Sequence, residues 1–189
     1  NTVREVLITL QAQGYVEIKR GKGVFVVDRS KYYVSMFMNW FKENEPHIQQ
    51  LLEVREILEP SAAKLAAQRI TNEEIQALDL IHQDFVRAVR NGNIEDMALH
   101  DQKFHQHIIK ASRNEMLDFF YTSMSPSLHG YLKKVFSAPA KPIPAIEVHN
   151  KILQALKSND EEMAYKLMAD HIHLSKTDMI NLVKKIEKK

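Results

Sequence analysis

The pattern of apolar and polar positions predicts helices along most of the chain. In the stretch 93–112, apolar residues recur at spacings of three and four, which places them on one face of a helix. These residues are Met97, Ala98, Phe104, Ile108 and Ile109. Asn93 can cap the start of this helix, and Asp96 is a second acceptor near its positive end. We therefore expect a helix over 93–112 whose apolar stripe faces a core.

The segments on either side carry the same helical signals. We predict further helices over 32–41, 45–69, 71–90, 115–136, 145–157 and about 161–185. Pro60 removes a backbone donor inside the second of these helices and should kink it or break it into two. Thr71 and Glu74 form a capping box, and the three prolines of 137–144 predict an extended linker. Because no strand signal follows Val27, the fold is expected to be mostly α, an antiparallel bundle of about six to seven helices.

The first part of the chain shows a different period. Residues 2–13 predict a short helix that Gly14 ends. Two β-type runs follow, 15–19 and 24–27, and the glycine-rich turn between them carries two cations. A helix followed by a basic-tipped hairpin is typical of the second half of a winged helix-turn-helix. An ordinary helix-hairpin edge of a larger domain is the alternative that this local pattern leaves open.

A polar connector at 28–30 marks the predicted domain boundary. Residues 1–30 would form the C-terminal part of a winged helix-turn-helix DNA-binding domain, and residues 31–189 an all-α domain. The net charge of the 189 residues is only +2. The basic excess is concentrated at the N-terminus, which is where a nucleic-acid contact would be expected.

Composition excludes several classes of protein. The chain has no cysteine, so disulfides, thiolate nucleophiles and cysteine-type zinc sites are all excluded. Hydrophobic residues make up 44% of the chain, enough for a substantial core. There is no apolar run of about 18 residues and no signal-peptide pattern. We expect a soluble, cytoplasmic protein with no membrane association.

Asp101 and His105 lie in the apolar stripe of the helix over 93–112. Four residues apart on a helix, their side chains share one face and can hold one ion. A carboxylate that faces a core without a partner would cost several kcal/mol. Its partner is therefore to be sought elsewhere in the chain.

Two further histidines occupy inward stripes. His149 and His171 are each flanked by apolar residues at helical spacing, whereas His173 must face water. Three inward histidines and one aspartate on three helices form a donor set of three nitrogens and one oxygen. Such a set suits zinc, and also manganese, nickel or iron. The alternative is that each histidine is an ordinary core residue bonded to a backbone carbonyl.

Arg55 also falls in an inward stripe. A buried guanidinium is costly unless it meets an anion, and its planar fork suits a carboxylate. We interpret Arg55 as the residue that binds a carboxylate ligand. The alternative is an ion pair with Glu59, four residues later on the same helix, with no role in ligand binding.

The stretch TVREVLITLQAQGYVEIKRGKGVFV resembles the recognition helix and wing of the GntR transcription regulators. The resemblance implies that Arg4 reaches a base edge in the major groove, with Thr2, Arg20 and Lys22 on the DNA backbone. The two helices that should precede the recognition helix are not in this sequence. Asn1 is therefore not expected to be the natural start, and this chain by itself is expected to bind operator DNA poorly.

The segment from Leu51 to His171 resembles the FCD ligand-binding domain of the FadR-type GntR subfamily. Its motifs match in order: R-x3-E at 55–59, D-x3-H at 101–105, E-x-H at 147–149 and D-H at 170–171. The resemblance implies that Asp101, His105, His149 and His171 bind a divalent ion, with zinc the first choice. It also implies a small organic acid as the effector, one carboxylate of which joins the ion, so that residues 31–189 are expected to form an effector- and metal-binding domain.

Two classes of function follow. The first is a DNA-binding transcriptional regulator, acting as a homodimer on two half-sites, whose helical domain senses a small carboxylate through a bound metal. The second is a metal-dependent hydrolase or isomerase built in a helical bundle. No clear extra general base accompanies the donor set, and an enzyme would not need the winged-helix remnant. We therefore favour the regulator and expect no catalytic residues.

Overall fold

The computed structural model describes residues 2–27, 48–137 and 142–187, with side chains in the last segment from 145 to 178. The chain divides into two compact units, Asn1–Glu45 and Pro46–Lys189. The predicted boundary at 28–30 and the predicted helix over 32–41 lie outside the described residues, so both stay predictions.

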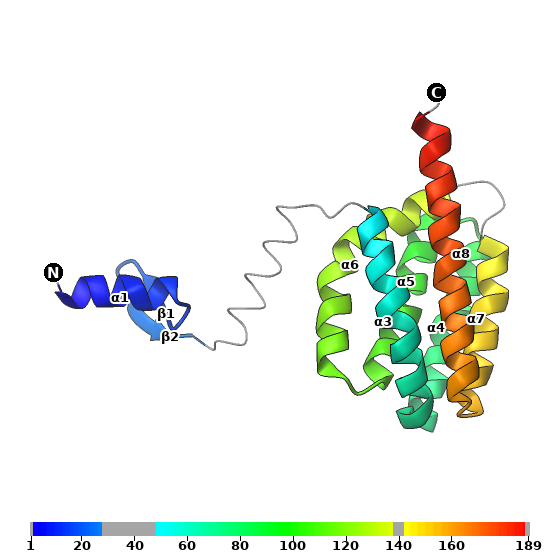
Figure 1. Cartoon of the computed structure of the whole chain (residues 1–189), viewed down its shortest axis with the longest axis horizontal. Coiled ribbons are helices and arrows are strands. Elements are labelled where there is room, and N and C mark those ends of the chain that lie inside the picture. The colour runs from blue at the N-terminus through cyan, green and yellow to red at the C-terminus, as the bar shows by residue number, and fades with distance from the viewer. Residues whose placement is uncertain (1, 28–47, 138–141, 188–189) are drawn as a thin grey trace. The chain divides into compact units, whose positions relative to one another are not determined.

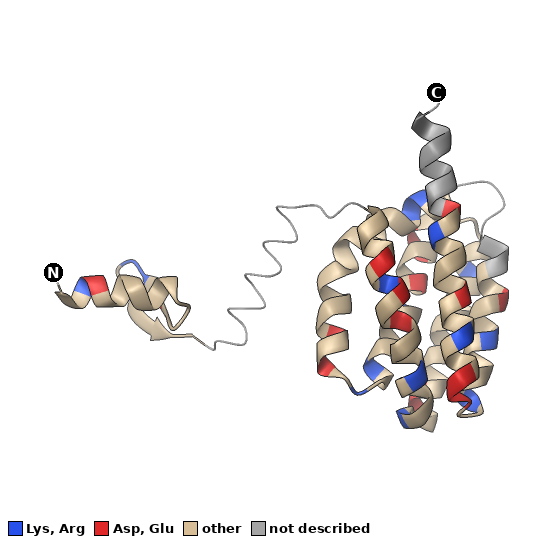
Figure 2. Ribbon diagram, in the orientation of Figure 1, with Lys and Arg blue, Asp and Glu red and all other residues tan. Residues whose placement is uncertain are grey.

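The first unit is a helix followed by a hairpin, as predicted. Helix α1 (Thr2–Ala12) is followed by Gly14, whose φ of 73° is the left-handed conformation that suits glycine after a helix. Strands β1 (Val16–Lys19) and β2 (Gly23–Val26) pair antiparallel. Figure 2 shows basic residues at the turn between the strands. Within the part of the chain that the structure describes, α1 has no buried residue.

The second unit is the predicted antiparallel bundle. Within the described residues it contains six helices, drawn from cyan to red in Figure 1: α3 (Ile48–Arg69), α4 (Asn72–Arg90), α5 (Ile94–Ala111), α6 (Glu115–Phe136), α7 (Pro142–Lys157) and α8 (Glu161–Glu187). Helix α3 packs along α8, and α7 packs against α4 and α8. The connections are only a few residues long, and the sequential pairs α4 and α5, α5 and α6, and α7 and α8 pack against each other.

The helix starts follow local side-chain chemistry. Thr71 Oγ1 accepts a hydrogen bond from the backbone of Glu74, and the Glu74 carboxylate accepts one from the backbone of Thr71, so the predicted capping box is present. Asn93 caps α5 and Asn114 caps α6 through their side-chain oxygens. These caps satisfy backbone donors that would otherwise be left unpaired at the helix ends.

The prolines behave differently from expectation. Helix α3 runs through Pro60 without a break, so of the two predicted outcomes, a kink or a division into two helices, the division is wrong. Packing along the length of α8 outweighs the loss of one backbone hydrogen bond. Helix α7 begins at Pro142 and not at Ala145, because proline fits the first turn of a helix. Pro126 lies midway along α6, and Figure 1 shows that helix changing direction at one end of the bundle.

Helix α5 lies at the centre of the bundle, in contact with α3, α4 and α6. Every member of its predicted apolar stripe is at most 4% exposed. Asp101 and His105 are buried in the same stripe, with exposed fractions of 3% and 1%. The core thus contains polar groups that need partners.

None of the described helices is long and apolar enough to cross a lipid bilayer.

Candidate metal centre

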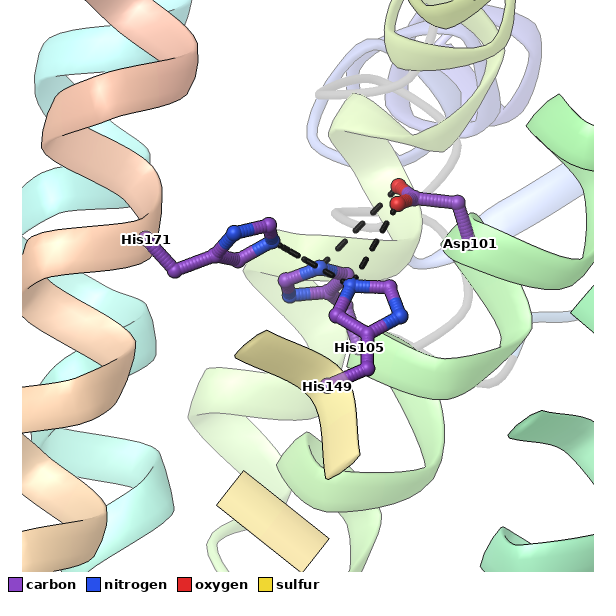
Figure 3. A group of neighbouring side chains, drawn as sticks. All are labelled: Asp101, His105, His149 and His171. Carbon is purple, nitrogen blue, oxygen red and sulfur yellow. Dashed lines mark hydrogen bonds and ion pairs between the residues drawn. The ribbon is translucent and has the colours of Figure 1, made fainter. Parts of the chain in front are cut away.

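Four predicted ligands meet in the middle of the bundle. Helix α5 supplies Asp101 and His105, α7 supplies His149, and α8 supplies His171. One nitrogen or oxygen from each residue lies within 4.8 Å of those from the other three. Figure 3 shows the four side chains pointing toward one another from three helices.

The spacing of these atoms resembles that of ligands around one ion. Nε2 of His171 lies 3.2 Å from Nε2 of His105 and 3.2 Å from Nε2 of His149. Nε2 of His149 lies 3.5 Å from an oxygen of Asp101. Tetrahedral zinc with nitrogen ligands at about 2.0–2.1 Å would hold those nitrogens about 3.4 Å apart. The donor set therefore fits a small divalent cation.

Hydrogen bonding alone does not satisfy the three imidazoles. A neutral ring has a single N–H, and Nδ1 of His105 uses it on the Glu59 carboxylate, at 2.5 Å. One N–H on His171 cannot serve both neighbouring Nε2 atoms. The three nitrogens face one another and not backbone carbonyls. This arrangement suits a shared cation better than three separate core histidines.

Burial keeps two of the histidines neutral and ready to bind a metal. Burial, with His171 and His105 nearby, lowers the pKa of His149 well below its ordinary value. Burial, with His105 and Arg55 nearby, lowers the pKa of His171 to about 3. Burial raises the pKa of Asp101, although His105 and Arg55 oppose that rise. A buried carboxylate among neutral imidazoles is an environment that a cation would stabilise.

Phe104 orients one of the rings. The ring of His149 stacks on Phe104 with 4.2 Å between centroids and an interplanar angle of 10°. Nδ1 of His149 has no hydrogen-bond partner among the described residues. Ring stacking therefore holds His149 in place, whereas a hydrogen bond to Glu59 holds His105.

Glu59, which the sequence predicts only as a possible ion-pair partner of Arg55, also contacts a proposed metal ligand. Its carboxylate pairs with Arg55 and also accepts the hydrogen bond from His105. Burial would raise the pKa of Glu59, but Arg55 and His105 outweigh burial and lower that pKa to about 2. Burial would likewise lower the pKa of Arg55, and Glu59 instead raises it above its ordinary value. The predicted alternative pair of Arg55 with Glu59 is therefore present, and the pair is connected to the metal ligands.

A cavity of about 260 Å³ opens beside the four ligands. Arg55, Asp101 and His171 are among the residues that line it, and the cavity beside His171 explains why that residue is only half-buried. The rest of the lining comes from α6, α7 and α8: Leu132, Val135, Phe136, Ala145, Val148, Leu174, Ser175 and Asp178. Ser175 and Asp178 were not predicted, although they lie four and seven residues after His171 and therefore on the same helix face.

The predicted DNA contacts belong to the first unit. Thr2 and Arg4 lie on α1, and Arg20 and Lys22 lie in the turn between β1 and β2. All four side chains are exposed. They are accessible to a nucleic acid, and their predicted roles stay predictions.

Comparison with known proteins identifies the family of this chain. The FCD domain matches residues 50–174. The HTH-type transcriptional regulator LutR of Bacillus subtilis is 26% identical over 178 residues, which cover 91% of this chain and 80% of that protein. The Uxu operon transcriptional regulator of Escherichia coli is 30% identical over 183 residues, covering 90% of this chain and 68% of that protein. Among solved structures, Streptococcus agalactiae GntR matches with a TM-score of 0.64 at 25% identity, covering 93% of this chain and 80% of that one. These similarities do not favour a metal-dependent enzyme.

Proposed function

This chain belongs to the FCD-domain regulators of the GntR family, and we propose that it controls transcription in response to a small organic acid bound beside a divalent metal ion. The observation that carries the proposal is the convergence of four ligand atoms next to a cavity that also contains a buried arginine. A sensor needs both a fixed recognition group and space for its ligand, and the two occur together here.

We assign the metal to Asp101, His105, His149 and His171. Three nitrogens and one oxygen favour zinc, with manganese, nickel or iron as the other candidates. An ion bound by these four residues would accept a carboxylate oxygen of the effector by taking a fifth ligand, since zinc can expand to five-coordinate and manganese, nickel and iron commonly take more than four ligands. Asp101 and His171 border the cavity, so a ligand there can approach the ion directly.

Arg55 is the proposed second anchor for the acid. Glu59 engages Nε and Nη2 of the guanidinium, and Arg55 still borders the cavity. A guanidinium offers five N–H donors, so those not used by Glu59 can bind a ligand carboxylate. The pair with Glu59 then fixes the orientation of the guanidinium and does not compete with the ligand.

The proposed output is DNA binding by the first unit. Arg4 would read a base edge, while Thr2, Arg20 and Lys22 would contact the phosphate backbone. We propose residues 1–30 as part of a winged helix-turn-helix and residues 31–189 as the sensing domain. A homodimer would place two such heads on two half-sites, and the effector would act by favouring one arrangement of the heads over another.

Elemental analysis of the purified protein tests the metal site. The parent should carry about one transition-metal ion per chain, and His149→Ala and His171→Ala should lose it. His173→Ala is the matched control, because His173 is exposed on the same helix as His171 and pairs with Glu56. A parent that takes up no zinc, manganese or nickel would refute the assignment.

A further inference from the structure

We propose that His82 and His149 hold one buried water molecule between their Nδ1 atoms, and that this water keeps Nε2 of His149 directed at the metal. The inference rests on the proposed metal site and adds a positioning residue on α4, a helix that supplies none of the four ligands. It follows from two buried nitrogens, from the packing around their rings and from the chemistry of an imidazole that binds a metal.

Nδ1 of His149 is a buried donor without an acceptor. Nε2 of the same ring faces His171 and Asp101, so Nε2 is the nitrogen that would bind the ion. The neutral ring then carries its hydrogen on Nδ1. That nitrogen has no hydrogen-bond partner among the described residues, and His149 is fully buried. Metal-binding histidines almost always donate this second N–H to a carboxylate, a backbone carbonyl or a water molecule.

His82 carries a matching nitrogen. The residue is 7% exposed, and its Nδ1 likewise has no hydrogen-bond partner within the described part of the chain. Burial lowers the pKa of His82, an effect that Asp79 opposes and to which Lys157 adds. The ring is therefore neutral at pH 7, and the tautomer with its hydrogen on Nε2 leaves a lone pair on Nδ1. A buried donor and a buried acceptor, each unpaired, thus belong to neighbouring rings.

The separation of the two rings suits a bridging water and not a direct hydrogen bond. Their centroids are 6.1 Å apart at an interplanar angle of 65°, which is too far for a nitrogen–nitrogen hydrogen bond of about 2.9 Å. One water can accept from Nδ1 of His149 while it donates to Nδ1 of His82. Buried waters typically pair polar groups that the protein leaves unsatisfied. Phe85 and Phe104, whose ring centroids lie 5.1 and 4.2 Å from that of His149, offer only the weak acceptors of their ring faces.

The water has a role that ring stacking cannot perform. Stacking on Phe104 fixes the plane of the His149 ring, but a half-turn about the bond that joins the ring to Cβ leaves this plane unchanged. Such a half-turn exchanges Nδ1 with a carbon and turns Nε2 away from the other ligands. Because the rotation breaks a hydrogen bond at Nδ1, that bond stabilises the orientation that binds the ion. His82 is accordingly a positioning residue of the metal site.

Zinc titration of three variants tests the inference. Competition with a fluorescent chelator gives the zinc affinity of each metal-free chain. His82→Phe keeps an aromatic ring but removes the acceptor, and we expect its zinc affinity to fall by about 10–100-fold, the range for lost supporting hydrogen bonds. His82→Asn places an amide oxygen close to the position of Nδ1 and should stay within a few-fold of the parent. His100→Phe is the matched control, because His100 also has a buried Nδ1 without a hydrogen-bond partner among the described residues, and it should bind zinc as the parent does.

Nuclear magnetic resonance of the zinc-loaded chain adds a measurement that a loss of folding cannot imitate. In the parent, the hydrogen on Nδ1 of His149 should show cross-relaxation with a bound water. The same signal should persist in His100→Phe and vanish in His82→Phe.

The outcomes separate this inference from the proposed function. If the parent binds zinc and His82→Phe binds it equally well, the inference is overturned and the proposed function stands. Equal losses of affinity in His82→Phe and His82→Asn would assign the effect to packing and would also overturn it, as would a zinc-loaded parent whose His149 hydrogen contacts no bound water. If the parent takes up no zinc, manganese or nickel, both are overturned.

Discussion

The carboxylate of Glu59 lies 2.5 Å from Nδ1 of His105, although the two residues are 46 positions apart in the sequence. This contact fixes the tautomer of His105 and presents the lone pair of its Nε2 to the other ligands. Because the same carboxylate pairs with Arg55, it links the proposed anion anchor on α3 to the proposed metal ligands on α5.

Replacing Glu59 should weaken metal binding without removing a ligand. Loss of such a supporting hydrogen bond typically costs about 10–100-fold in metal affinity, and we expect Glu59→Gln to fall in that range. Competition with a fluorescent chelator measures the affinity. Glu147→Gln is the control, because Glu147 is exposed on the helix that carries His149. Equal metal affinities in the two variants would show that Glu59 does not support the metal site.

Substitutions at Arg55 should weaken effector binding without changing metal binding. Arg55→Lys keeps the positive charge but loses the fork that binds a carboxylate at two points, so effector affinity should fall while metal content stays at the level of the parent. Arg55→Ala should abolish effector binding, again with the metal retained. It should also destabilise the fold by about 3–5 kcal/mol, because it leaves Glu59 buried without its cation. Calorimetry and elemental analysis on the same samples report both quantities, and loss of the metal from the lysine variant would contradict the assignment.

Stability of the metal-free protein should fall as the pH is lowered. The pKa of His171 is depressed to about 3 in the folded state, so between its unfolded value near 6.5 and about 3 the unfolded chain binds the extra proton. The stability of the fold is therefore intact above that window and is lost as the pH falls through it. Each such histidine contributes up to about 1.4 kcal/mol per pH unit within the window.

Urea unfolding of the metal-free protein at pH 7 and pH 5 measures this dependence. His171→Gln should flatten it, since the variant removes one of the groups that take up a proton on unfolding. The exposed His173→Gln should keep the slope of the parent. A parent whose stability is the same at both pH values would show that the buried histidines are not kept neutral by the fold.

Arg4 gives a prediction for the first unit. In a protein that joins this chain to the two preceding helices of a winged helix-turn-helix, Arg4→Ala should cost about 1–3 kcal/mol of operator binding and relax specificity at one base pair. Lys22→Ala, by contrast, should weaken all DNA sequences about equally, because a phosphate contact carries no sequence information. Binding to a set of operator variants at fixed salt distinguishes the two. Unchanged sequence preference in Arg4→Ala would exclude base reading by that residue.

Helical periodicity predicted much of the bundle because side chains on one face of a helix share one environment. The positions of Asp101, His105, His149 and His171 on inward stripes followed from spacing alone, and the structure brings the four together. Periodicity could not predict which side chains of different helices contact each other. The contact between Glu59 and His105 depends on how α3 packs on α5, and no local pattern contains that information.

The other differences from prediction have similarly physical causes. Pro60 is a helix breaker by local propensity, and tertiary packing overrode that propensity. Ser175 and Asp178 lie on the same helix face as His171, but helical spacing alone does not show that this face lines a cavity. Spacing identifies a face of a helix, and the rest of the fold decides whether that face meets a core, a cavity or water.

The four ligands join α5, α7 and α8, so one ion would hold together positions that lie up to 70 residues apart, from 101 to 171, and His105 extends this link to Glu59 on α3. An ion that binds only the folded chain stabilises it by about 4 kcal/mol when its free concentration is a thousand times the dissociation constant. In a cell short of that metal, the unclamped bundle would open more often and be cleared faster by proteases. Metal supply would then set how many copies of the regulator a cell holds, before any effector acts on them.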